Sequence, residues 1–423
     1  MMSSAALAPD TAYIDFGRAR TNGYVHRIAL ACVWLTIALS SIVFSEPAPV
    51  DALTLGLMIL LPVVGLTQSK PLLWAGFAIL LVITASGFLS AIPARDSALA
   101  TSYMIVSLYL VGAAFLFASF VAKRPEAHMP LILNAFLIAG VIAALCGIVG
   151  YLDLLPGAYD RFTRYDRASG PFKDPNVFGP FLIAPLLTAL HLWLVRPLHR
   201  GIMPIVAAAI LAAGILFSFS RGAWAAAAIA VSLYVYFYTI TVRTNRERVK
   251  LGALILFGAM ALVMLLAVAL QSNAIASLLE QRTALTQSYD VGPNGRFGGQ
   301  MKAVGLILEN PFGIGSQVFA RFYHHEEVHN VYLSMFLNAG WIGGLLFLLV
   351  AVATIVVGFR HALLRGRETP LFLIVYAALV GNLCEGVLID SDHWRHIYLL
   401  LGLVWGMMAA DRPTTRRPSI VSA

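Results

Sequence analysis

Charged residues are scarce in this chain. Asp, Glu, Lys and Arg make up only 12% of its 423 residues, and 59% of the residues are hydrophobic. A soluble domain carries about 25% charged residues, so the bilayer is the expected solvent. Lipid offers no partner for backbone N–H and C=O groups, which favours membrane-spanning helices. The apolar runs are continuous, whereas a β-barrel would show short alternating segments.

Cysteine is scarce as well. The three cysteines, Cys32, Cys146 and Cys384, all lie inside apolar runs. Their spacing provides neither a disulfide framework nor a zinc site, so we expect small core residues. The net charge of +8 is explained by Lys and Arg around membrane spans, and no nucleic-acid partner is expected.

About twelve apolar runs approach the roughly 20 residues that a membrane-spanning helix needs. The fold class predicted is therefore an all-α polytopic membrane protein with about 12 transmembrane helices. The second and last runs are short, and the tenth is long enough to tilt or break near Gly340. The runs are Ile28–Phe44, Ala52–Leu66, Leu72–Leu89, Ala98–Val121, Met129–Tyr151, Val177–Val195, Ile202–Phe219, Ala223–Ile240, Leu251–Leu270, Val331–Phe359, Leu371–Leu388 and Ile397–Ala410.

The distribution of basic residues predicts the orientation. With both termini inside, 18 of the 29 Lys and Arg residues lie inside, three lie in short outer loops and eight lie in two long outer loops. This bias favours cytoplasmic termini. The predicted organisation is a cytoplasmic tail at 1–27, helices 1–9 at 28–270 with an outer polar loop at 152–176, a large periplasmic loop at 271–329, helices 10–12 at 330–410, and a cytoplasmic tail at 411–423.

Polar residues in the outer loops are the candidates for chemistry, because charge near the membrane is costly. The first cluster, RYDRASGPFKDPNVFGPFL, contains Arg167, Lys173, Asp174 and Asn176 just before a span. Asp174 or Asn176 is expected to cap the following helix. A helix N-terminus with nearby cations suits an anion, and a charged loop that simply caps a helix is the alternative.

Arg221 stands alone between two apolar runs, in the segment FSFSRGAWA. At that depth an isolated arginine is expected to bind an anion. Snorkelling of its side chain to lipid headgroups is the alternative.

A third polar segment starts at Arg296. It predicts an amphipathic helix to Leu308, which Asn310-Pro311 ends, followed by a tight, exposed turn at Gly313 and Gly315. Gly340 and Gly344 further on form a small-xxx-small pattern that predicts close helix packing.

Histidines crowd the end of this segment, in HHEEVHN from His324 to Asn330. Consecutive residues point in different directions and no H-E-x-x-H spacing occurs, so a metal site is not expected. Neutral imidazole accepts a proton near neutral pH, so His329 is a candidate general base; an interfacial histidine that caps a helix is the alternative.

A fourth cluster, CEGVLIDSDHWRH, places Glu385 in an apolar run and Asp390 and Asp392 in a D-x-D pattern. Some metal-dependent glycosyltransferases use paired carboxylates. D-x-D alone is a weak signal, and a loop with helix caps explains it better.

At these residues the sequence resembles the O-antigen ligase / O-antigen polymerase family of bacterial membrane proteins. The motifs that carry the resemblance are SGPFKDPNVFG, SFSRGAW, Gly295-Arg296, NPFGIG and HNVYLSMFLNAGWIGG, in this order across about Arg164–Gly344. The resemblance implies a fold similar to membrane glycosyltransferases with polyprenyl-linked donors, and a large periplasmic loop over a cavity open to the outer leaflet.

The family also implies the chemistry: a metal-independent glycosyltransferase of the bacterial inner membrane, with no cofactor. By motif match, Arg221 and Arg296 would bind the diphosphate of an undecaprenyl-diphosphate-linked glycan, and His329 would be the base. A single displacement predicts an inverting reaction. Arg167, Lys173, Asp174, Asn176 and Asn330, with Gly313 and Gly315, are the expected substrate-binding residues.

The acceptor stays open between lipid A-core (a ligase), a growing polysaccharide (a polymerase) and, more remotely, a protein hydroxyl. Neither long loop has Arg followed eleven residues later by Gly, a spacing of some polymerases, which favours O-antigen ligase. A secondary transporter, such as a bicarbonate transporter, is a remote alternative, because twelve spans with inside termini also describe transporters. The sequence shows no clear paired repeat or broken midplane helices of that class.

Overall fold

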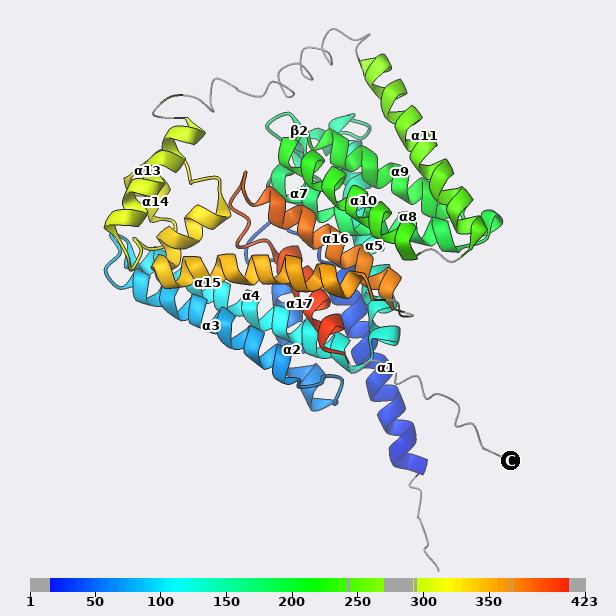
Figure 1. The fold of residues 1–423 in the computed structure, drawn as a ribbon, viewed down its shortest axis with the longest axis horizontal. Helices are drawn as coiled ribbons and strands as arrows, with labels where there is room; N and C mark the ends of the chain where they lie inside the picture. The colour runs from blue at the N-terminus through cyan, green and yellow to red at the C-terminus, as the bar shows by residue number, and fades with distance from the viewer. Residues whose placement is uncertain are drawn as a thin grey trace, which may run out of the picture.

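The computed structural model describes residues 16–241, 244–269, 292, 295–364, 366 and 368–410. Most of the chain is helical, as the continuous apolar runs predict (Figure 1). The early elements are α1 (Phe16–Ala38), α2 (Pro49–Val63), α3 (Pro71–Ala91), α4 (Ser97–Lys123), α5 (Pro125–Tyr151), α6 (Ala158–Phe162), β1 (Thr163–Arg164), β2 (Arg167–Ala168), α7 (Pro175–Phe181) and α8 (Ile183–Val195). The later ones are η1 (Leu198–Arg200), α9 (Ile202–Phe217), α10 (Arg221–Thr241), α11 (Asn245–Ala269), α13 (Arg296–Glu309), α14 (Val318–Phe322), α15 (Val331–Ala362), α16 (Thr369–Glu385) and α17 (Arg395–Ala409).

Six helical segments of the described chain are long and apolar enough to cross a membrane. They are Pro71–Ala91, Ser97–Lys123, Pro125–Tyr151, Pro175–Val195, Arg221–Thr241 and Val331–Ala362. Five shorter apolar helices accompany them. The protein is thus an all-α membrane protein of several spans, and the number of twelve stays a prediction. Residues 270–291, which open the predicted periplasmic loop, lie outside the described residues.

Two of the predicted spans are interrupted. The run Val177–Val195 forms α7 and α8, which meet at Leu182 just after Pro180. The long tenth run breaks at Gly340, where φ is +65° and ψ is −172°, as predicted. Gly340 is needed there because a Cβ would lie 2.6 Å from the carbonyl oxygen of Pro311, in a backbone region that L-residues rarely adopt.

Small residues allow close helix contacts, but at places other than the predicted one. Gly344 faces the ring of Phe336 in its own helix, so Gly340 and Gly344 do not form a helix-packing face. One such contact is between α17 and α4, where a Cβ on Gly402 would lie 2.5 Å from the carbonyl oxygen of Ala114. Gly406 meets Ala118 one turn further on, which is the small-xxx-small arrangement of membrane helices.

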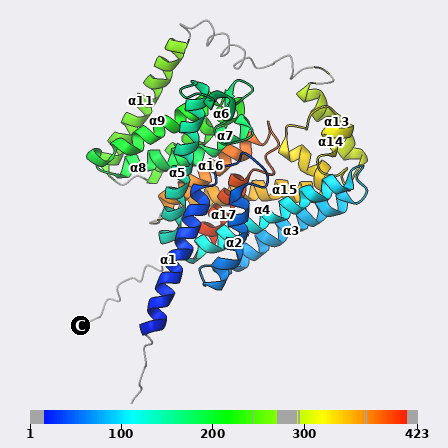
Figure 2. The ribbon, with the colours of Figure 1, turned by 180° about the vertical axis from the view of Figure 1, so that it is seen from behind.

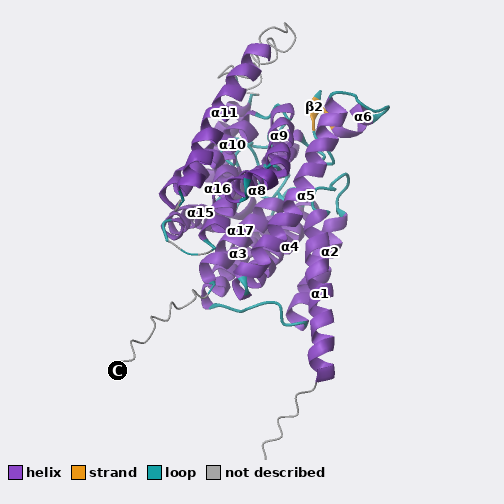
Figure 3. Ribbon diagram, turned by 90° about the vertical axis from the view of Figure 1, so that its right-hand side faces the viewer, coloured by secondary structure: helices purple, strands orange, loops and turns teal. Residues whose placement is uncertain are grey.

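The helices form a bundle whose elements cross at several angles (Figures 2 and 3). α15 runs along α3, and α10 packs along α16. At one end of the bundle, α10 begins at Arg221, α15 begins at Val331 and α16 ends at Glu385. We call this the site end, because the candidate residues gather around it. α13 and α14, yellow in Figure 1, lie beside the start of α15.

Candidate functional site

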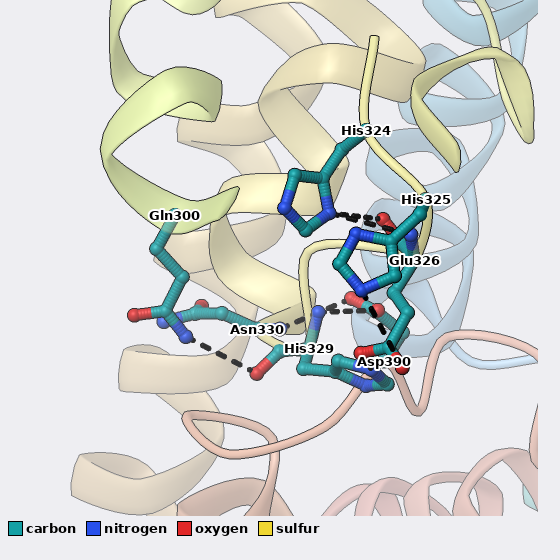
Figure 4. A network of polar contacts seen from close by, with 7 residues as sticks. All are labelled: Gln300, His324, His325, Glu326, His329, Asn330 and Asp390. Atoms are coloured by element: carbon teal, nitrogen blue, oxygen red, sulfur yellow. Dashed lines mark hydrogen bonds and ion pairs between the residues drawn. The ribbon is translucent and has the colours of Figure 1, made fainter. Parts of the chain in front are cut away.

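His329 is held in an unusual backbone conformation at the start of α15. Its φ is +53°, a left-handed value that few non-glycine residues adopt and that the surroundings must stabilise. Its N–H donates to Oδ2 of Asp390 at 2.8 Å, and the N–H of Asn330 donates to Oδ1 at 3.2 Å (Figure 4). The hydroxyl of Ser334 donates to the same carboxylate. Asp390 therefore fixes the turn that carries His329.

Asn330 begins the helix that follows. Its side-chain oxygen accepts the N–H groups of Tyr332 at 3.1 Å and Leu333 at 3.2 Å, so it is the N-cap of α15. The start of the span at His329-Asn330 is thus as predicted. With this cap and Asp390, the donors at the start of α15 are already used by the protein itself.

The imidazole of His329 remains partly accessible, with 29% of its side chain exposed. Its Nε2 lies 3.4 Å from Oε2 of Glu326. Figure 4 shows this contact beside the rings of His324 and His325, with Glu326 between the histidines and Asp390 below. A carboxylate on one ring nitrogen favours a proton there and leaves the other nitrogen as the acceptor.

Asp390, which binds the backbone of His329, interacts electrostatically with two further carboxyl groups, Asp392 and Glu327. Burial raises the pKa of Asp390 and that of Asp392, and the charge of Asp392 raises the pKa of Asp390 further. Burial, followed by the charge of Asp390, raises the pKa of Glu327 to about 7. Among the residues that the structure describes, no group of three His, Cys, Asp or Glu side chains could hold a metal ion.

α13 connects Arg296 to His329. The side chain of Gln300 donates to the carbonyl oxygen of His329 at 3.4 Å. Arg296, the first residue of α13, lies four positions earlier and therefore on the same helix face. Gly299 leaves room for the ring of His324, since a Cβ would lie 3.2 Å from its Cε1. The predicted helix from Arg296 is confirmed, and it ends at Glu309 with Asn310 as its C-cap.

Arg221 is the first residue of α10. The turn before it is held by Arg167, a buried side chain whose Nε donates to the carbonyl oxygen of Ser218 at 2.7 Å. Arg167 also donates through Nη2 to Oδ1 of Asn176 at 2.8 Å. Asp174 is the N-cap of α7, accepting the N–H of Asn176 at 2.7 Å. The first polar cluster therefore positions the Arg221 turn.

A short hairpin positions the side chain of Arg167 against this turn. β1 and β2 pair as antiparallel strands with Arg164 opposite Arg167. Tyr165 and Asp166 join the strands, and both have φ of +55°, as in the tight turns that suit a twisted hairpin. Tyr165 and Asp166 give no glycine signal for such a turn, so the sequence did not predict it.

The end of α16 lies between the two halves of the site. A Cβ on Gly222, next to Arg221, would lie 2.6 Å from Oε1 of Glu385. The next residue, Gly386, accepts the N–H of Val331 at 2.8 Å through its carbonyl oxygen. Arg221 and His329 thus flank the segment 385–390. The D-x-D residue Asp390 acts here as a cap for His329 and Asn330, which agrees with the cap interpretation of that motif.

One expectation about the site needs correction. The turn at Gly313 and Gly315 is buried rather than exposed. Its backbone binds α3 and α15, with the N–H of Gly315 donating to Oγ of Ser90 at 3.0 Å and that of Ile314 to the oxygen of Leu337 at 2.8 Å. The positive φ values of the two glycines, +86° and +92°, allow this close approach.

Lys173 lies beside Asp174 in the wall of a cavity, and its ion pair joins it to Glu46 rather than to the His329 turn. Its Nζ is 3.5 Å from Oε2 of Glu46, and Arg395 lines the same cavity. Gln300, Ser334 and Asp390 were missed as members of the His329 site. Their contacts join α13, α15 and the loop after α16. No local sequence pattern predicts contacts between segments so far apart in the chain.

Residues 206–348, which contain Arg221, Arg296 and His329, match a family described as O-antigen ligase. The chain is similar to the O-antigen ligase family over this segment, which is less than half of its 423 residues. No curated protein matches the chain. The family includes O-antigen ligases and polymerase-like enzymes, so the match supports a membrane enzyme of glycan assembly that uses a lipid-linked glycan donor.

Proposed function

We propose that this protein moves a glycan from undecaprenyl diphosphate to an acceptor hydroxyl at the periplasmic face of the inner membrane, with lipid A-core as the acceptor. The observation that carries this proposal is the placement of two arginines. Arg221 and Arg296 are each the first residue of a helix, and both lie beside the segments that hold His329. A helix N-terminus carries a partial positive charge, so each arginine adds to a local preference for an anion.

The arginines would bind the diphosphate of the donor. When the acceptor oxygen bonds to the anomeric carbon, the bond from that carbon to the diphosphate oxygen breaks and negative charge grows on the leaving group. At an effective dielectric constant of about 20, a unit-charge contact at ~4 Å contributes roughly 4 kcal/mol before desolvation. Only the part of that energy that grows in the transition state speeds the reaction.

His329 would take the proton of the acceptor hydroxyl. Glu326 at 3.4 Å from Nε2 favours a proton on that nitrogen, so Nδ1 is the proposed base. After the transfer, the carboxylate of Glu326 stabilises the imidazolium and accepts its Nε2 proton. Glu326 then releases this proton to water, because 54% of its side chain is exposed. A positioned general base typically contributes about 10²–10⁴-fold. A single displacement inverts the anomeric centre and needs no metal.

The other candidate residues would shape the site. Arg167, Asp174 and Asn176 hold the Arg221 turn, and Asn330 begins the helix after His329. Gly313 and Gly315 dock the outer segment on α3 and α15. Lys173 lines a separate cavity, where it would contact a distal part of the substrate.

Reconstitution tests the proposal. Purified protein in proteoliposomes would receive a labelled glycan on undecaprenyl diphosphate, with lipid A-core or with free donor as the acceptor. A labelled lipid A-core conjugate supports the ligase, and a lengthened donor glycan identifies a polymerase of the same family instead. Absence of any new conjugate, with labelled solute accumulating inside the vesicles, would exclude the enzyme and favour a transporter.

His329→Ala is the matching active-site test. We expect transfer at neutral pH to fall by about 10²-fold or more, in line with loss of a general base. Normal transfer in this variant would remove the base assignment while leaving the diphosphate site intact.

A further inference from the structure

A partly enclosed cavity lies next to the proposed reaction site, between α1, α2, α4, α7 and α17. Its volume is about 110 Å³, and a single water needs roughly 10–15 Å³ in this measure. The cavity therefore has room for several waters or for one sugar ring. Apolar side chains form its floor, and three aromatic rings, Phe172, Phe181 and Trp394, form part of its wall.

Charged side chains run from the mouth of this cavity inward. Glu46, 57% exposed, lies 3.5 Å from Nζ of Lys173 and 3.6 Å from Nη1 of Arg395. Arg395, 24% exposed, then donates to both oxygens of Asp51 at 2.7 and 2.8 Å. Asp51 is only 13% exposed, and it also accepts the N–H of Ala48 at 2.7 Å.

Stability of the fold alone does not explain this ion-pair network. Removing ions from water costs several kcal/mol each, and apolar replacements of buried ion pairs are often as stable. The chain uses few charged residues in total, yet four meet here. In addition, Ser40 lines the cavity, and its hydroxyl oxygen is buried with no hydrogen-bond partner among the described residues. The protein itself therefore leaves a polar group beside the cavity unsatisfied, which is uncommon for a buried hydroxyl.

The chemistry of the wall fits a sugar ring. Two cations in the wall, Lys173 and Arg395, are balanced by the wall carboxylates Glu46 and Asp174. Asp51, which binds Arg395 from behind the wall, adds a further negative charge, so the cavity does not attract a diphosphate. A sugar ring presents hydroxyl groups at its edge, which suit these charged donors and acceptors. It also presents C–H groups on its faces, which suit aromatic rings and an apolar floor.

Two segments connect the cavity to the proposed reaction site. In the loop after α16, Asp390 binds the backbone of His329, and Trp394, four residues later, lines the cavity. At the start of α7, Asp174 lines the cavity, and Asn176 binds the arginine that holds the Arg221 turn. A ring seated here lies against both segments.

We propose that this cavity is a saccharide subsite that holds one sugar ring of a glycan substrate during transfer. The inference rests on the proposed function for the identity of the glycan. Donor and acceptor glycans both present such rings, so the experiment must distinguish these two sources.

Two variants test the subsite by kinetics in proteoliposomes. Ala113→Phe fills the cavity from α4, since Ala113 lines it, and Glu46→Gln removes a charge at the exposed mouth without changing size. We expect each to raise KM for one glycan at least tenfold and to leave kcat within about twofold. The glycan whose KM rises is the one that uses the subsite. Unchanged KM for both glycans in folded Glu46→Gln and Ala113→Phe would overturn the proposal.

A binding measurement separates this inference from the transfer reaction. Saturation-transfer NMR on the full chain in nanodiscs would use two lipid-free probes, the repeat-unit oligosaccharide and the core oligosaccharide. We expect one probe to give a signal that Ala113→Phe abolishes and Arg296→Ala retains. A signal that Ala113→Phe leaves unchanged, or no signal with either probe, would exclude the subsite. Loss of transfer alone, with this signal intact, would count against the proposed reaction instead.

The matched control is Glu126→Gln. Glu126 is an exposed carboxylate, 58% exposed, in an ion pair with Arg124 at 3.8 Å, and it does not line the cavity. We expect its KM values and its NMR signal to equal those of the wild type. Equal KM increases in Glu126→Gln and Glu46→Gln would show a general charge effect and would contradict the subsite.

Discussion

Asp390 accepts the backbone N–H of His329 at 2.8 Å across 61 residues of sequence. This contact stabilises a left-handed conformation that a histidine does not readily adopt. It connects the loop after α16 to the start of α15, and so it sets the direction of the proposed base. Asp390 is therefore a positioning residue, and its effect on transfer should come through His329.

Asp390→Asn tests this relationship. The amide keeps the shape of the carboxylate but lacks its charge and one acceptor oxygen, so the three donors around it cannot all be satisfied. We expect kcat to fall by about 10–10²-fold with KM for the donor unchanged, measured as initial rates in proteoliposomes. Asp392 accepts the hydroxyl of Tyr103 and no N–H of His329, so Asp392→Asn should lower kcat less. An equal loss in both variants would contradict the positioning role.

Arg296→Lys tests recognition of the diphosphate. Lysine keeps the charge but lacks the planar fork that binds two phosphate oxygens together. We expect transfer to fall by about 10²-fold, and Arg221→Lys to behave alike. The control is Arg164→Lys in β1, where the arginine side chain donates to the carbonyl oxygens of Asp160 and Thr163. Wild-type transfer by Arg296→Lys would show that bidentate binding is unnecessary.

The sequence was most informative where a local rule decides the structure. Arg296 to Asn310 combines an amphipathic run with a stop signal, so α13 could be predicted closely. Asp174 before Pro175, and Asn330 before an apolar run, identify two helix starts for the same reason. The break at Gly340 follows from the length of the run around it.

Relations between distant segments could not be predicted in this way. The contacts of Asp390 with His329, and of Arg167 with Ser218, join residues 61 and 51 positions apart. Each depends on how the helices pack. The same reason explains why Gly313 and Gly315 are buried: nothing in NPFGIG indicates that α3 and α15 cover it.

Glu327 should make stability depend on pH near neutrality. Its pKa in the folded protein is about 7, above the ordinary glutamate value of 4.5, because burial and the charge of Asp390 disfavour ionisation. Below about pH 4.5 the carboxyl is protonated in both folded and unfolded chains and contributes no pH dependence. Between about 4.5 and 7 the unfolded chain releases its proton first, so the folded state loses stability as pH rises.

Glu327→Gln removes this loss. We expect the melting temperature of the variant in detergent to exceed that of the wild type more at pH 7.5 than at pH 4.5, measured by intrinsic fluorescence. Glu309→Gln, in an exposed residue at the end of α13, should show no such difference between the two pH values. A gain for Glu327→Gln that is the same at both pH values would contradict the titration.

Gly402 and Gly406 should control the stability of the α4–α17 contact. A Cβ at Gly402 would lie 2.5 Å from the carbonyl oxygen of Ala114, and one at Gly406 would lie 2.6 Å from that of Ala118. Backbone atoms cannot move aside as a flexible side chain does, so Gly402→Ala must separate the two helices. Overpacking of this kind typically costs about 1–3 kcal/mol. We expect a lower melting temperature, and aggregates that elute before the folded protein in size-exclusion chromatography.

The control for this prediction is Gly56→Ala in α2, where a Cβ meets nothing within 4 Å. Alanine there is favoured by about 1 kcal/mol through helix propensity, so its melting temperature should stay equal or rise. α17 begins at Arg395, next to the proposed saccharide cavity, so separation of α17 from α4 should also raise KM for the glycan bound there. Gly402→Ala with wild-type stability would show that the two helices do not pack as closely as the structure indicates.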